Sequence, residues 1–173
     1  MERSDLIQSL RQHGWAVTER PSQQLRLPPE VAARHPKLPK SLATFLGGLS
    51  ACEDATQTTW FLCEADYAGT GGAAFRWDEW ERMSLDAAGD DLRLVAEVRA
   101  FWDAHLPFLL SVRDGYAYHA VRTATDGFGR VVAGREPEFE EASVVAESFG
   151  EFLSSLLGSA PDAAPGTSPG GER

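Results

Sequence analysis

Residues 142–158, ASVVAESFGEFLSSLLG, decide the fold of this chain. The small and β-branched residues 143–146 are typical of a short strand. Ser148 is a good helix N-cap, and Glu151, three residues later, completes a capping box. Apolar residues then recur at helical spacing as far as Gly158, a common helix stop: Phe149, Phe152, Leu153, Leu156 and Leu157. The stretch predicts a strand that turns directly into an amphipathic helix, which can close a small α+β domain.

The plainest hairpin signal lies just upstream. Residues 108–112 and 116–121 are rich in apolar and aromatic residues, and Asp114-Gly115 between them is a turn signal. Three further segments have the composition of strands: 58–64, 130–133 and 143–146. Because the chain has neither a βαβ rhythm nor an internal repeat, we predict an α+β fold with a central antiparallel β-sheet flanked by helices.

Helices are predicted around these strands. Apolar residues recur at helical spacing after Ser4, over residues 40–46, and from Asp90 or Asp91 to about Ala104. The apolar stripe of the last helix is expected to contain Leu92, Val95, Val98 or Arg99, and Trp102. The Pro-, Gly-, Ala- and Ser-rich tail lacks such periodicity and is predicted to be disordered. The chain therefore divides into an N-terminal helix with an extended lead-in, a main domain and a tail: 1–26, 27–158 and 159–173.

The 173-residue chain has a net charge of −10, and this charge is unevenly distributed along the sequence. Residues 1–44 hold seven Lys and Arg against four Asp and Glu, whereas residues 45–158 hold eight against twenty. An acidic body repels nucleic acid and attracts a basic protein, although it can also serve solubility alone. We find no secretory signal and no apolar run that could span a bilayer, so we expect a cytoplasmic protein without membrane contact.

Few residues suggest catalysis or metal binding. The loop 69–72, Gly-Thr-Gly-Gly, lacks the Gly-Lys-Ser/Thr ending of a phosphate-binding loop. Cysteine and histidine occur without the short ligand spacings of zinc sites, so we expect no metal and no cofactor. A small hydrolase that uses Cys63 with His105 or His119 stays open as an alternative, because such partners meet only in space.

Two acidic segments are candidate contacts for a protein partner. The first is the run 136–141, in which glutamates surround Phe139: Glu136, Glu138, Glu140 and Glu141. It is either a solvated connection or a contact patch with Phe139 as an apolar anchor. The second is Asp66 with Tyr67, at the entry to the glycine loop. In both, carboxylates would steer a basic partner and aromatic rings would hold it.

Several elements resemble the SUKH superfamily by their sequence and order: LPKSLATFL at 38–46, WFL at 60–62, FRWDEWE at 75–81, LPF at 106–108 with DGY at 114–116, and AESFGEFL at 146–153. The resemblance implies a SUKH-like α+β domain over residues 27–158, with no catalytic set to carry over. Bacterial members are often immunity proteins that neutralise a toxin, commonly a nuclease, and eukaryotic members act as scaffolds.

From the resemblance we therefore expect a non-enzymatic protein-binding domain, most simply an immunity protein whose partner is a basic toxin domain. An interaction scaffold without a toxin partner is the runner-up, and the small hydrolase is the third alternative. The loop 69–72 and the long helix ending near Ala104 make this chain larger than a minimal member of the superfamily.

Overall fold

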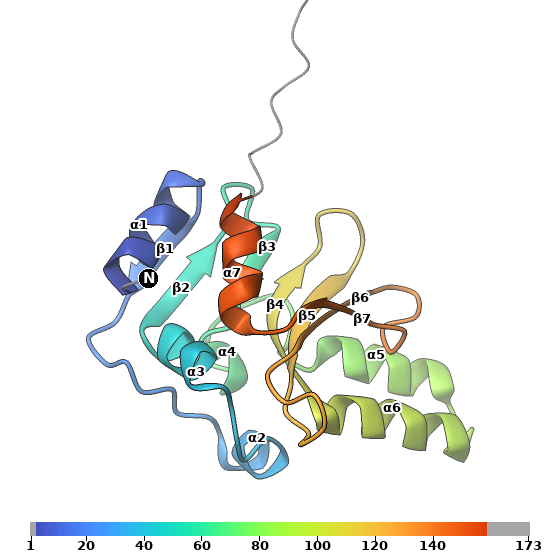
Figure 1. Cartoon of the computed structure of the whole chain (residues 1–173). Helices are drawn as coiled ribbons and strands as arrows, with labels where there is room; N and C mark the ends of the chain where they lie inside the picture. Colours follow the sequence, from blue (N-terminus) through green and yellow to red (C-terminus); the bar gives the residue numbers. More distant parts are fainter. Residues whose placement is uncertain (1–2, 159–173) are drawn as a thin grey trace, which may run out of the picture.

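The computed structural model describes residues 3–158, so the predicted tail lies outside the described residues (Figure 1). Seven strands form one sheet in which each strand pairs antiparallel with the next along the chain. The strands are β1 (Ala16–Glu19), β2 (Leu49–Glu53), β3 (Thr59–Phe61), β4 (His105–Ser111), β5 (Ala117–Arg122), β6 (Val131–Arg135) and β7 (Ser143–Ala146). The predicted α+β class with an antiparallel sheet is confirmed.

Helices cover the two faces of the sheet unequally. They are α1 (Arg3–Gln12), α2 (Pro29–Arg34), α3 (Lys40–Gly47), α4 (Glu64–Tyr67), α5 (Glu79–Ala88), α6 (Leu92–Ala104) and α7 (Phe149–Gly158). Figure 1 shows α3 and α7 in front of the strands, while α5 and α6 form a hairpin that extends to one side. None of the helices within residues 3–158 has the length and apolar character that crossing a membrane requires.

The predicted hairpin of β4 and β5 is confirmed, with Leu110 opposite Tyr118. Alternation along β5 places neighbouring side chains on opposite faces. The ring of His119 packs 4.8 Å from that of Phe152 on α7, and the ring of Tyr118 packs 4.8 Å from that of Trp102 on α6. The hairpin thus contributes to the core on both sides of the sheet.

The closing helix α7 also follows the prediction. Phe149, Phe152 and Leu153 are buried, and both phenylalanines pack against Phe108 of β4 with ring centroids 5.3 Å apart. The backbone N–H of Glu151 donates to Ser148 Oγ at 3.2 Å. In return, the Glu151 carboxylate accepts from the backbone N–H of Glu147, one residue before the expected partner. The strand-to-helix turn is therefore held from both directions.

Three details differ from the sequence prediction. Asp91 caps α6 as expected, but Leu92 is 82% exposed, so the buried stripe of this helix begins only at Val98. The strand expected over residues 58–64 is shorter, because the chain turns into α4 at Glu64. Strand β2 was not predicted; it pairs with β1 of the lead-in and so joins residues 16–19 to the same sheet.

Candidate protein-binding site

Five aromatic side chains form a row that connects the two segments singled out by the sequence. The row starts at Trp60 of β3, whose ring stacks on Phe75 with centroids 6.1 Å apart. Phe75 contacts Tyr116 at 5.5 Å, and Tyr116 stacks on Trp80 of α5 at 4.7 Å. Trp80 in turn stacks on Phe139 at 5.6 Å. One end of the row therefore lies beside the glycine-rich loop and the other lies in the glutamate-rich segment.

Phe139 does not lie on the surface as the predicted anchor would. Its side chain is 3% exposed, and its carbonyl oxygen accepts a hydrogen bond from the hydroxyl of Tyr118. The ring is enclosed because it stacks on Trp80. Phe139 consequently fixes residues 136–141, here called the acidic loop, to the body of the protein and is not available to a partner.

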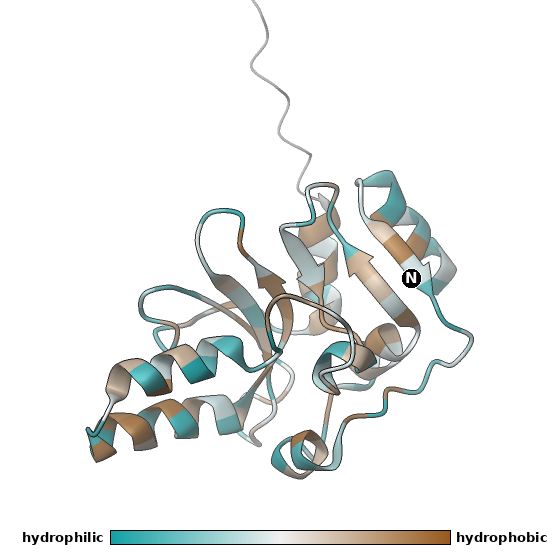
Figure 2. Cartoon of the chain, turned by 180° about the vertical axis from the view of Figure 1, so that it is seen from behind, coloured by the Kyte–Doolittle hydropathy of each residue, from teal (hydrophilic) through white to brown (hydrophobic). Residues whose placement is uncertain are grey.

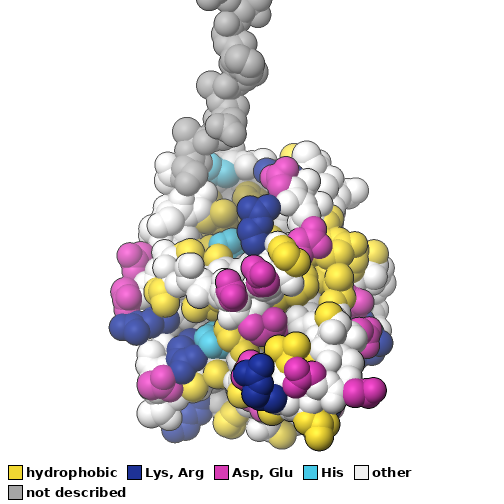
Figure 3. Space-filling model, turned by 90° about the vertical axis from the view of Figure 1, so that its right-hand side faces the viewer, with side chains coloured by type: hydrophobic (Ala, Val, Ile, Leu, Met, Phe, Trp, Pro, Cys, Tyr) yellow, Lys and Arg dark blue, Asp and Glu magenta, His cyan; other side chains and the backbone are white. Residues whose placement is uncertain are grey.

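The glutamates of the acidic loop are not equivalent. Glu140 accepts a hydrogen bond from Trp102 Nε1 at 2.7 Å, so its carboxylate is tied to α6. Glu136, Glu138 and Glu141 are exposed, and none of these three forms an ion pair with any residue in the range 3–158. Figure 3 views the side of the molecule where β6 and β7 lie, and carboxylates are prominent among its apolar and arginine side chains. Three free carboxylates thus remain from the predicted patch.

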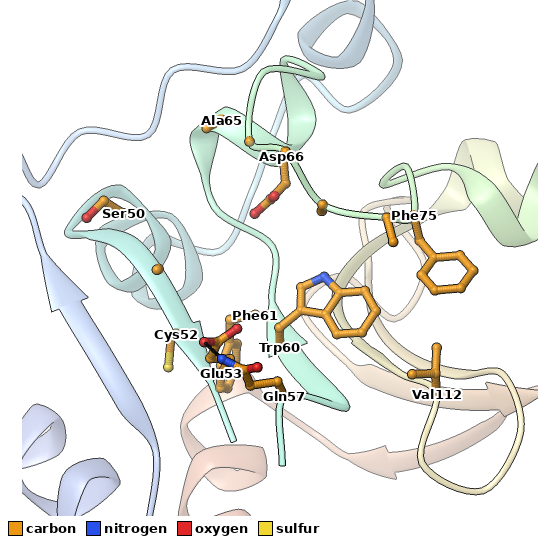
Figure 4. Close-up of a pocket in the computed structure, with 15 residues that line it drawn as sticks. Ser50, Cys52, Glu53, Gln57, Trp60, Phe61, Ala65, Asp66, Phe75 and Val112 are labelled. Carbon is orange, nitrogen blue, oxygen red and sulfur yellow. Dashed lines mark hydrogen bonds between the residues drawn. The ribbon is translucent and has the colours of Figure 1, made fainter. Parts of the chain in front are cut away.

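A cavity of about 420 Å³ lies at the other end of the aromatic row, between β2, β3 and the glycine loop, residues 68–74 (Figure 4). From behind, the chain between α4 and α5 passes in front of the strands (Figure 2). The lining includes two carboxylates and an indole ring, those of Glu53, Asp66 and Trp60, and contains no lysine, arginine or histidine. The cavity is therefore acidic and partly aromatic.

Asp66 and Tyr67 are adjacent in sequence but have different surroundings. Asp66 lines the cavity, and its Oδ2 accepts from the backbone N–H of Cys63 at 2.7 Å, which closes the first turn of α4. Partial burial raises the pKa of Asp66. Tyr67 is 2% exposed and its hydroxyl donates to the carbonyl oxygen of Pro107 at 2.7 Å. The predicted contact at Tyr67 therefore lies in the core, and only Asp66 faces open space.

Trp60 and Glu53 belong to the cavity but were not singled out in the sequence. The indole nitrogen of Trp60 is buried and has no hydrogen-bond partner within residues 3–158. Figure 4 shows this nitrogen on the edge of the ring that lies toward Asp66 of α4. The period-2 alternation of β3, in which Trp60 and the buried Phe61 point to opposite faces, is the signal that could have drawn attention to Trp60.

The residues that a hydrolase would need are largely enclosed, because Cys63 and His105 are buried and His119 is half-buried. Burial raises the pKa of the Cys63 thiol to about 12 and lowers the pKa of His119 to about 4. Burial also lowers the pKa of His105, whose Nδ1 lies 2.8 Å from the carbonyl oxygen of Phe101. Among the described residues, no hydrogen bond joins a cysteine to a histidine, and no group of three or more acidic, histidine or cysteine side chains is placed to hold a metal ion.

The fold and the site define a small α+β domain that presents an acidic cavity and an acidic loop at the two ends of one aromatic row. Comparisons of the chain with protein-family models, curated proteins and solved structures returned no match. Because a fold alone does not imply a function, the function has to be inferred from the side chains at the cavity and the acidic loop.

Proposed function

We propose that this chain is a non-enzymatic protein-binding domain with a basic protein partner, and that it acts as a bacterial immunity protein against a toxin such as a nuclease. The observation that carries the proposal is a surplus of carboxylates without ion pairs. Most arginines of residues 3–158 already pair with an acid. The carboxylates left without a cation include those at the cavity and the acidic loop: Glu53, Asp66, Glu136, Glu138 and Glu141.

A nuclease is a suitable partner because its active site must attract nucleic acid phosphates and is therefore basic. A domain with unpaired surface carboxylates complements such a site and is steered toward it by long-range attraction. The narrower role of immunity protein is supported by the order of sequence elements that resembles the SUKH superfamily. A scaffold that binds a basic protein without any toxin would use the same surface.

The pKa values of the candidate cysteine and histidine argue against the hydrolase alternative. A nucleophilic cysteine must reach its thiolate form, and a thiol with a pKa of about 12 is protonated near neutral pH. A general base works best with a pKa close to the working pH, whereas His119, with a pKa of about 4, is a weak base near neutral pH. These values support a binding role.

The deciding experiment uses the product of the gene adjacent to this one. That protein is expressed in cells alone and together with this chain, and growth is measured. We expect the adjacent product to be toxic and this chain to restore growth through direct binding. If the adjacent product is harmless and does not bind, the immunity role is wrong and the scaffold role replaces it.

A charge-reversal variant tests which surface is used. Replacing Glu136, Glu138 and Glu141 by lysine should reduce protection, because the approach of a basic partner would be repelled. A matched control carries the same change in charge at three other exposed acids that form no ion pair, those at positions 30, 86 and 90. Equal loss of protection in the two variants would mean that net charge matters and that the acidic loop does not.

A further inference from the structure

The cavity beneath the glycine loop has the size and lining of a ligand site. Its volume of about 420 Å³ falls in the range of about 300–1,000 Å³ that small-ligand pockets occupy. Small residues on the loop leave it open, while Trp60 and Phe75 supply apolar walls. Nothing in the lining carries a positive charge.

Two carboxylates at the cavity lack a cation. Glu53 accepts a hydrogen bond from Gln57 Nε2 at 3.0 Å, and Asp66 accepts one from the N–H of Cys63 through Oδ2. Neither forms an ion pair with any described residue. Gly71 approaches Asp66 so closely that a Cβ on it would lie 2.5 Å from Oδ1. Because Gly71 has no Cβ, the loop can pass directly beside Oδ1 of Asp66 without displacing the carboxylate.

The ring of Trp60 selects the kind of cation. It offers a flat aromatic surface, on which a planar guanidinium stacks better than a compact ammonium. The indole N–H at the edge of this ring is buried and has no acceptor among the described residues, so it is not a contact for the ligand, but its NMR signal reports on binding at the ring.

We propose that this cavity binds an arginine side chain of the partner protein, with the guanidinium held by the charge of Asp66 and against the ring of Trp60. The proposal rests on the proposed basic partner and adds to it the residue type that is recognised. Glu53, which also lines the cavity, adds a second negative charge to its lining.

The test uses a small probe, N-acetyl-arginine methylamide, and follows the indole N–H signal of Trp60 by proton–nitrogen NMR. The variant Trp60→Phe identifies that signal by its disappearance. We expect a saturable shift with the arginine probe, and binding at least about tenfold weaker for the uncharged citrulline analogue, because a charge-assisted contact is lost.

Variants of the protein assign the contact. Asp66→Asn keeps an oxygen for the N–H of Cys63 but removes the charge, and it should weaken the probe about tenfold or more. Asp114→Asn, an exposed acid outside the cavity, is the control and should bind like wild type. The proposal is overturned if Trp60 shows no saturable shift up to about 50 mM probe, or if Asp66→Asn binds as tightly as wild type.

A lysine probe completes the test. Binding of N-acetyl-lysine methylamide with the affinity of the arginine probe would overturn the stacking of a guanidinium on Trp60. Because the probes need no partner, this result is independent of the growth experiment. If the neighbouring gene product is harmless but the arginine probe gives a saturable shift, the immunity role is refuted and the cavity assignment stands. If the neighbouring product is toxic and neutralised but the probe gives no saturable shift, the cavity assignment is refuted and the immunity role stands.

Discussion

Phe152→Ala tests how α7 is fixed to the sheet. The Phe152 side chain is 6% exposed, and its ring lies 5.3 Å from that of Phe108 and 4.8 Å from that of His119. These neighbours belong to paired strands that cannot collapse into the space left behind. We therefore expect a loss of about 3–5 kcal/mol in the free energy of unfolding. That is a large part of the stability of about 5–15 kcal/mol that domains of this kind have.

Ser148→Ala, at the start of the same helix, should cost less. It removes one hydrogen bond of 3.2 Å at an exposed site, where water can take the place of the lost acceptor. An expected cost of about 0.5–2 kcal/mol follows. Phe128→Ala is a matched control, because Phe128 is 42% exposed and its removal leaves no buried space.

Urea unfolding followed by circular dichroism measures all three variants. We expect the midpoint to fall most for Phe152→Ala, less for Ser148→Ala and least for Phe128→Ala, with similar slopes against urea. The reasoning is refuted if Ser148→Ala costs more than Phe152→Ala, or if Phe128→Ala costs as much as Phe152→Ala. Either result would mean that the capping or the core assignment is wrong.

Two further predictions concern pH and close packing. Burial lowers the pKa of His119 from 6.5 to about 4, so the unfolded chain takes up the proton first. The contribution of His119 to the free energy of unfolding should be fully present above about pH 6.5 and should decrease as the pH drops toward 4. His119→Gln should remove up to about 1.4 kcal/mol per pH unit of that slope, measured by urea unfolding at several pH values. An unchanged slope would contradict the burial of a neutral imidazole. Gly134→Ala should destabilise by about 1–3 kcal/mol, because its Cβ would lie 2.5 Å from the Tyr118 hydroxyl and would disturb the bond to Phe139. Gly158→Ala, where a Cβ meets nothing within 4 Å, is its control, and equal thermal stability of the two variants would count against the close approach.

Local signals account for the elements that the sequence predicted well. The β4–β5 hairpin is specified by a turn dipeptide between two apolar runs, and α7 is specified by Ser148 and the spacing of its apolar residues. By contrast, β2 was missed because it follows directly after Gly47-Gly48, and its strand state depends on pairing with β1 and β3. The pairing with β1 is non-local, so no local pattern indicates it.

The candidate site was predicted only in part, because a sequence gives residue type without the direction of the side chain. A phenylalanine among glutamates is compatible with a surface anchor, yet Phe139 turns inward onto Trp80 while the neighbouring Glu138 remains exposed. Tyr67 is likewise in the core, whereas Asp66 beside it faces the cavity. The cavity is lined by residues within 50–75 and by Val112, and it depends on how β2, β3 and the glycine loop lie against one another, so it could not be inferred before the strands were paired.

The most direct test of the central claim is the association rate of this chain with the product of the adjacent gene, measured by stopped-flow fluorescence at about 50 mM and about 500 mM salt. An acidic surface that steers a basic partner predicts fast association that slows markedly at high salt. The lysine variant of Glu136, Glu138 and Glu141 should associate about tenfold more slowly at low salt and show little salt dependence, while the control at positions 30, 86 and 90 should resemble wild type. Equal rates and equal salt dependence for wild type and the lysine variant would contradict the claim.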